Sequence, residues 1–329
     1  MKSVVLLSIS WFLLVANTLF SQLSYKINLE SGVFFNSLES NFSENTNVYR
    51  LQGNLRYKTK FQNSTSSFSL KIKPEIFGDD YHSIKYAAQG DYQYNATNVL
   101  WKSLISYRNF NYIFSESSTN FSSFNFIVGS EFDLLNNHPI QLYLGYAYQN
   151  IDFAGKRTSD YFYLDSKLKN SVTNQLSYQY GFFIENFISE NNTIKENGWY
   201  YGPQVSLSYL KQFLLNLEYK ILLISSTNLT FPSLEHRIKT IGGIRLNQKL
   251  SFFLLADLYI RDTHIKNSKS EKKVLLPTKN ENHISTKINY KFLNNLSIYL
   301  KAGYFREELL SDNSKIDGLN VIVGIELKN

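Results

Sequence analysis

Two short motifs contain the residues whose type and spacing could support catalysis or metal binding. Asp262-Thr263-His264 places a carboxylate two residues from an imidazole, a pair that could act as a general base. Asp79-Asp80 and His82 could bind a divalent cation. The 329 residues include five His and no Cys, which excludes thiol nucleophiles and Cys-ligated zinc or iron–sulfur centres. Both motifs fall at the ends of polar segments. We interpret them as solvated loop residues and expect no enzyme activity, no metal and no cofactor.

A second set of chemically active residues consists of cations at alternate positions. Side chains at i and i+2 lie on the same face of a strand, so the cations of one segment point to one side. Clustered cations in a water-filled space with apolar walls would attract anions. The candidates for ligand binding are therefore Arg50, Arg56, Lys58, Lys60, Lys71, Lys73, Arg237, Lys239 and Arg245. The alternative is cross-strand neutralisation, for example of Lys71 and Lys73 by Glu75 or Asp91.

The elements that carry these cations have a period of two. Over 48–61 the odd positions are mostly apolar or aromatic, whereas the even positions from Arg50 onward are polar and include four cations. The same split recurs over 68–76, 175–185 and 283–292. No stretch of comparable length has a helical period of 3.6 residues. Alternation of this kind predicts strands with one apolar and one polar face.

The segments between these strands alternate between short and long. Polar turns fall near 62–67, 95–98, 135–139, 169–174, 210–212, 247–249 and 293–295. Longer polar segments fall near 36–47, 78–82, 114–120, 154–159, 188–198, 225–233, 262–281 and 308–317. This rhythm predicts about 16 antiparallel strands that begin and end on the short-turn side. Alternation is poor over 160–168. If that segment is a loop, the count is 14.

The N-terminus has the pattern of a secretory signal. Lys2 precedes an apolar stretch from Val4 to Ala16, and the segment that follows, as far as Ser21, includes the polar residues Asn17 and Thr18. The apolar stretch is too short to span a bilayer as a helix, so we expect residues 1–21 to be a signal peptide and 22–329 a single β domain. An uncleaved anchor or a buried strand is the alternative.

Three features favour a membrane barrel over a soluble β-sandwich. The polar face is crowded with charge, although nearly every strand also has an apolar face. Aromatic residues flank the connections at both ends of the strands, as Tyr57, Phe61 and Phe68 do around the first short turn. Rings at both ends of apolar strands are typical of the two membrane interfaces. A signal sequence in a chain without Cys fits a bacterial envelope protein.

The chain resembles the outer-membrane β-barrels of Gram-negative bacteria in these features and in an apolar final strand over 319–327. Its general architecture is similar to that of porins. The resemblance implies an all-β fold: a single antiparallel transmembrane β-barrel with short periplasmic turns and longer extracellular loops. It also implies an outer-membrane location, with outer-membrane lipid and the barrel assembly machinery as partners. The chain ends in Lys328-Asn329, whereas the last strand of such barrels commonly ends in an aromatic residue.

The two motifs described first also invite comparison with barrel proteases of the omptin type, which use an Asp-x-His pair and a second Asp pair near the outer rim. Here, however, the apolar positions from Phe252 to Ile260 predict the lipid-facing side of their strand. Asp262 and His264 continue that side unless a bulge intervenes. We therefore do not expect proteolysis.

These observations predict a passive channel for small hydrophilic solutes, with anions favoured by the alternating cations. The alternative is a barrel without transport activity, an anchor whose long loops dock another envelope or surface protein. The basic pI of about 9.1 does not indicate nucleic-acid binding. The cations alternate along strands, and the expected location in the cell envelope is not where nucleic acid is found.

Overall fold

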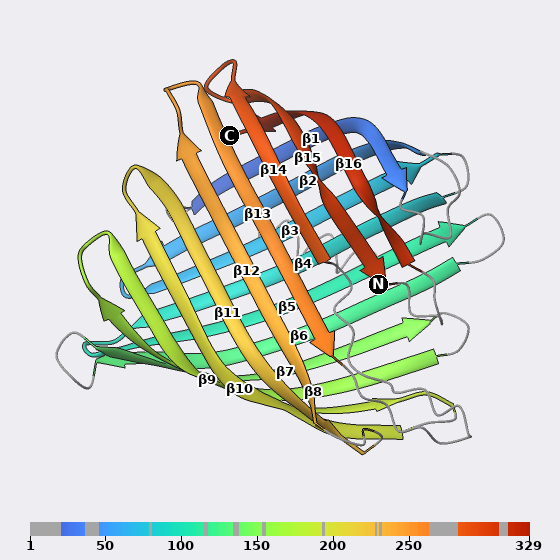
Figure 1. Ribbon diagram of the computed structural model, residues 1–329. Coiled ribbons are helices and arrows are strands. Elements are labelled where there is room, and N and C mark those ends of the chain that lie inside the picture. The colour runs from blue at the N-terminus through green and yellow to red at the C-terminus, as the bar shows by residue number, and fades with distance from the viewer. Residues whose placement is uncertain are drawn as a thin grey trace, which may run out of the picture.

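Sixteen antiparallel strands form a closed barrel in which each strand pairs with its neighbours in sequence and β1 pairs with β16 (Figure 1). The computed structural model describes residues 21–36, 46–78, 81–114, 118–133, 138–152, 156–192, 195–227, 229, 232–262, 282–308 and 315–329. The strands are β1 (Ser21–Asn36), β2 (Thr46–Phe61), β3 (Ser64–Phe77), β4 (Tyr81–Asn95), β5 (Val99–Phe114), β6 (Ser118–Asp133), β7 (Pro139–Asp152), β8 (Lys156–Ser171), β9 (Leu176–Glu190), β10 (Lys195–Leu210), β11 (Phe213–Ser226), β12 (Ser233–Arg245), β13 (Leu250–Asp262), β14 (Asn282–Lys291), β15 (Leu296–Glu308) and β16 (Lys315–Lys328).

The predicted fold class and the count of 16 are confirmed, and the rival count of 14 is wrong. The segment 160–168 lies inside β8, which pairs with β7 and β9 along its length. Its alternation is hard to see because Tyr161 and Tyr163 take inner positions, where a polar residue is the usual choice. Outward-facing Asp160 disturbs the pattern further. No helix in the described part of the chain is long and apolar enough to span a membrane.

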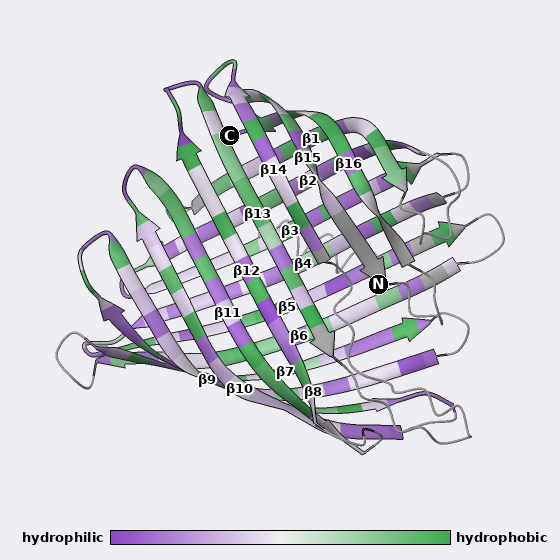
Figure 2. Cartoon of the chain, in the orientation of Figure 1, coloured by the Kyte–Doolittle hydropathy of each residue, from purple (hydrophilic) through white to green (hydrophobic). Residues whose placement is uncertain are grey.

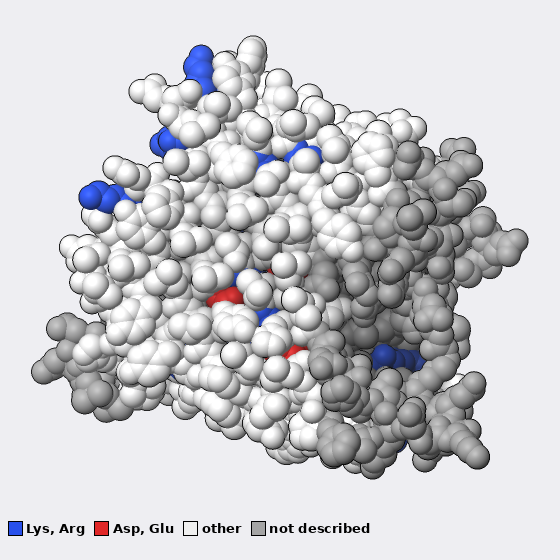
Figure 3. Space-filling view, viewed as in Figure 1, with Lys and Arg blue, Asp and Glu red and all other residues white. Residues whose placement is uncertain are grey.

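The two faces of the barrel differ as the alternation predicts. Leu51, Leu55 and Ile72 are exposed on the outer face, and green and purple alternate along individual strands in Figure 2. The surface visible in Figure 3 is mostly uncharged: Lys and Arg stand out at its short-turn end, and only small patches of charged atoms are visible elsewhere. An apolar outer band allows the strands to contact lipid, while closure of the barrel leaves no unpaired sheet edge.

Aromatic residues border this apolar band at both ends. Phe61, Phe68 and Trp101 are exposed near the short turns, and Tyr49 and Trp199 are exposed toward the long connections. The predicted aromatic girdles are therefore present. The expected signal segment, residues 1–21, lies outside the described residues apart from Ser21, the first residue of β1.

Candidate lumenal binding surface

The strand registers place all the predicted cations on the inner face of the barrel. Arg50 lies opposite Glu30 on β1 and Glu75 on β3, and positions two apart along β2 continue that face. The inner face of β2 and β3 thus contains Arg56, Lys58, Lys60, Lys71 and Lys73. Across the barrel, the inner face of β12 contains Arg237, Lys239 and Arg245. The structure therefore divides the candidates into two groups on different parts of the wall.

Four of these cations form an exposed group at the short-turn end, which we call the entrance cations: Arg56, Lys58, Lys60 and Lys71. Their register partners between β2 and β3 are neutral, with Lys58 opposite Ser67 and Lys60 opposite Thr65. Arg56 donates to Ser67 Oγ at 3.4 Å, and that hydroxyl donates to Asp91 at 3.0 Å. Neutral residues separate the charges across the strands, which reduces their mutual repulsion.

Arg50 and Lys73 belong to a different arrangement, a buried ionic cluster around Glu75. The Glu75 carboxylate is fully buried and forms ion pairs with Arg50, with Lys73 at 2.7 Å and with Lys85 at 3.1 Å. Ser83 also donates to it at 3.1 Å. The alternative of neutralisation therefore applies to Lys73, although its pair with Glu75 forms within β3 and not across strands, and Arg50 binds the same carboxylate.

The cluster continues around the wall through Glu30. Arg50 lies 3.5 Å from one Glu30 oxygen, and the hydroxyl of Tyr299 on β15 donates to the other at 2.7 Å. A chain of ionic and polar contacts therefore joins β15, β1, β2, β3 and β4. It spans the closure between β1 and β16, where the two ends of the sheet meet.

The cations of β12 are also close to carboxylates. Arg237 forms an ion pair with Glu235, and its guanidinium lies 5.0 Å from the centre of the Tyr200 ring. Lys239 lies opposite Glu218 on β11 and Asp257 on β13. Arg245, at the short-turn end, is exposed. This part of the wall carries balanced charge, in contrast to the entrance cations.

Sequence reasoning missed a third group, on the inner wall of β4 to β11. Lys102 forms an ion pair with Glu131 at 3.0 Å, and Lys220 lies 3.2 Å from Glu218 and 3.9 Å from Asp165. Of these residues, Lys102, Asp165 and Lys220 line a cavity of about 430 Å³ together with Tyr143, Tyr163 and Phe183. The signal was present in the parity of β8, where Tyr163 and Asp165 alternate with Phe162 and Leu164. Recognising this group from the sequence would have required the register between neighbouring strands.

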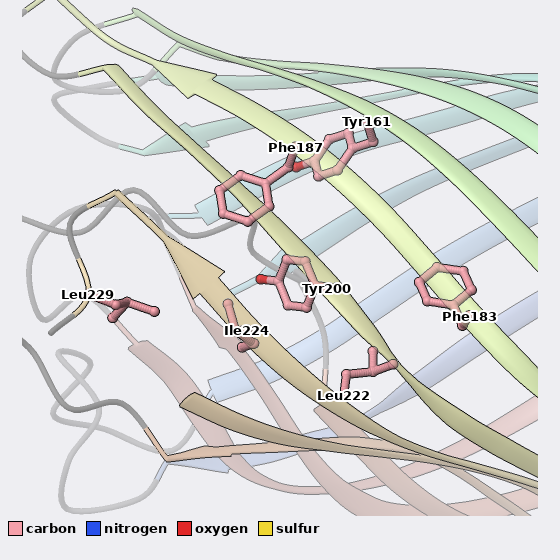
Figure 4. Packing of buried hydrophobic residues seen from close by; sticks show 7 residues of the cluster. All are labelled: Tyr161, Phe183, Phe187, Tyr200, Leu222, Ile224 and Leu229. Carbon is pink, nitrogen blue, oxygen red and sulfur yellow. The ribbon is translucent and has the colours of Figure 1, made fainter. Parts of the chain in front are cut away.

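A buried apolar cluster occupies the inner wall near the loop end of β8 to β11. Tyr161, Phe187, Tyr200 and Ile224 belong to it, and Leu229 joins them from beyond the end of β11 (Figure 4). The ring centres of Phe187 and Tyr200 are 5.3 Å apart. These inward-pointing side chains are buried and pack against one another on the inner wall.

Most of the residues first considered for catalysis or metal binding fall outside the described part of the chain. His82 is exposed, whereas Asp79, Asp80 and His264 lie outside the described residues. Within the described ranges, no group of three His, Cys, Asp or Glu side chains is placed to hold a metal ion.

Comparison with known proteins shows that this chain is similar to solved structures in its fold. No protein-family model and no curated protein matches the chain. Among solved structures, CdiB from Acinetobacter baumannii is similar over 93% of this chain, with a TM-score of 0.50 and 9% identity, and this chain spans 60% of that one. OccAB4 from the same organism is similar over 94% of this chain and 98% of its own length, with a TM-score of 0.45 and 11% identity. Together with the closed sixteen-stranded topology, the similarity to CdiB establishes that the chain has the fold of outer-membrane β-barrels.

Proposed function

We propose that the protein is an outer-membrane channel, without catalytic activity, through which small hydrophilic solutes diffuse and in which anions are favoured. The observation that carries the proposal is the group of entrance cations on the inner face. Barrels of sixteen or more strands commonly enclose an aqueous lumen, which side chains on the wall alone do not fill.

The charge distribution supports anion preference. Arg56, Lys58 and Lys60 follow one another along β2, and all three are exposed. Most of the other inner cations lie near carboxylates, so this group dominates the potential at the short-turn end. An apolar wall concentrates the field of such charges in the water between them, which raises the local concentration of anions.

Reconstitution in planar bilayers tests this proposal. A channel would give discrete conductance steps, and in a KCl gradient its reversal potential would have the sign of chloride preference. A folded barrel that gives no conductance would contradict the channel proposal. A reversal potential with the opposite sign would contradict the anion preference alone.

The second candidate function is the docking platform, and the outer face near the loop end favours it. There the outward positions of β5 to β10 become polar, and cross-strand amide contacts replace apolar side chains. Asn109 donates to Asn120 at 2.9 Å, and Asn186 donates to Asn197 at 3.1 Å. A polar sheet beyond the lipid band offers a surface for another envelope protein. Absence of conductance from folded barrels would favour this function over transport.

A further inference from the structure

The cavity on the inner wall between β4 and β11 combines flat aromatic surfaces with charged groups. Its volume of about 430 Å³ lies within the range of small-molecule sites. Its lining includes the apolar Leu104 and Ile127, two tyrosines on β7 and β8, and the charged Asp91 and Lys102. Its lining contains no residue of the ionic cluster around Glu75, and its Asp91 accepts a hydrogen bond from Ser67, which in turn accepts one from Arg56 of the entrance cations.

Two tyrosine rings lie flat on the wall because each crosses a glycine of the preceding strand. A Cβ atom added to Gly145 would lie 2.0 Å from Cζ of Tyr163, and one added to Gly129 would lie 2.1 Å from Cδ1 of Tyr143. The Tyr163 hydroxyl reaches past β7 and donates to Asn125 on β6 at 3.2 Å. One face of each ring is therefore pressed against the backbone, and the other face is directed toward the interior.

Polar groups surround these rings and are already held in place. Lys102 lies 3.0 Å from Glu131 and donates to the Tyr143 hydroxyl at 3.4 Å. Gln204 donates to one oxygen of Asp165 at 2.5 Å. Lys220 Nζ lies 4.3 Å from the centre of the Phe183 ring. Such contacts limit side-chain motion, so a ligand would meet preorganised hydrogen-bonding groups.

The charge of the lining distinguishes this cavity from the entrance cations. Two cations, Lys102 and Lys220, are matched by two anions, Asp91 and Asp165. A balanced lining gives no net attraction for an ion, but it supplies strong donors and acceptors to a neutral polyhydroxylated molecule. The apolar ring faces require that such a molecule also present an apolar surface.

We infer that this cavity is a binding site for the pyranose ring of a neutral saccharide. A pyranose presents C–H groups on its faces and hydroxyls around its edge, which matches flat tyrosines bordered by charged and amide groups. The volume is sufficient for a mono- or disaccharide. The inference rests on the proposed function in one respect: in the membrane, the saccharide reaches the site through the lumen.

Saturation-transfer NMR on the folded barrel in detergent tests the site directly. The probe is methyl β-D-glucopyranoside, and the matched control is sorbitol, which has a similar set of hydroxyls and no ring. We expect saturable transfer to the ring C–H protons of the glucoside and none to sorbitol. Equal transfer to both compounds, or no saturable transfer to the glucoside, would overturn the inference.

Variants locate the binding at the tyrosines. Tyr163→Leu should weaken glucoside binding roughly tenfold, because it removes an aromatic contact surface. Tyr163→Phe, which keeps the ring, should bind within about twofold of wild type, as should Phe110→Leu, which removes an inner-wall ring outside the cavity. If Tyr163→Leu does not fold, Tyr143→Leu serves in its place. Unchanged binding in the folded leucine variant would overturn the site.

Conductance separates this inference from the proposed function. A barrel that binds the glucoside but does not conduct would support the site and contradict the channel. A conducting barrel without saturable binding would overturn the site and leave the channel proposal standing.

Discussion

Lys73 on β3 and Lys85 on β4 lie directly opposite each other, and both ammonium groups bind the same carboxylate, that of Glu75. Two like charges at directly opposed positions destabilise a strand pair unless a counterion lies between them. Glu75 is that counterion, and it also pairs with Arg50. The β2–β3–β4 part of the wall therefore depends on one buried negative charge.

Glu75→Gln should lower the free energy of unfolding by about 3–5 kcal/mol, since it leaves buried cations without their counterion. Urea unfolding of the refolded barrel, followed by heat-dependent gel mobility, measures this loss. Glu218→Gln is the matched control, because Glu218 pairs with Lys220 but its side chain is 35% exposed. A half-solvated pair contributes less, about 1 kcal/mol or below. Equal losses in the two variants would show that Glu75 has no special role.

The outer face should tolerate charge poorly. Leu55→Arg and Leu254→Arg should each destabilise the barrel by about 2–4 kcal/mol, because both side chains lie on the lipid-facing side near the middle of the band. Gln52→Arg, at an inner position of β2, should cost much less. Unfolding free energies in lipid vesicles measure the three changes. Similar losses for all three would mean that the inner and outer faces are misassigned.

Much of this architecture could be predicted from the sequence, because lipid outside and water inside impose opposite requirements on alternate residues. That contrast located the entrance cations on the inner face. It identified Glu75 as a partner of Lys73, but not the convergence of Arg50 and Lys85 on the same carboxylate, because those contacts depend on strand register, which composition does not reveal. It also failed for the cavity on the inner wall, because Tyr143 and Tyr163 are aromatic residues at inner positions. Their fit depends on Gly129 and Gly145, each on a neighbouring strand.

The sidedness of the barrel can be tested with epitope tags. Tags at Asn41, Lys156 and Lys269 should be accessible on intact cells, whereas a tag at Asn295, in the turn between β14 and β15, should be accessible only after permeabilisation. The reason is that short turns face the periplasm in barrels of this kind. Asn41 and Lys269 lie outside the described residues. Labelling of Asn295 on intact cells would reverse the assigned orientation.

The last prediction concerns the entrance cations and ion selectivity. Lys58→Gln combined with Lys60→Gln should move the reversal potential in a KCl gradient toward cation preference without unfolding the barrel. Both side chains are exposed, and their partners on β3 are Ser67 and Thr65, so their removal leaves no carboxylate unpaired across that strand pair. The shift should be larger at about 0.01 M salt, where the Debye length is about 30 Å, than at about 1 M, where it is about 3 Å.

A matched control removes the same charge from elsewhere at the same end of the barrel. Lys211→Gln combined with Lys249→Gln changes two exposed lysines in the turns after β10 and β12, which lie beyond the ends of the strands and off the inner wall. This variant should shift the reversal potential much less, because the apolar wall does not concentrate the field of charges that lie outside the lumen. Equal shifts in the two variants would mean that net charge, and not the placement of Lys58 and Lys60 on the inner face, determines selectivity.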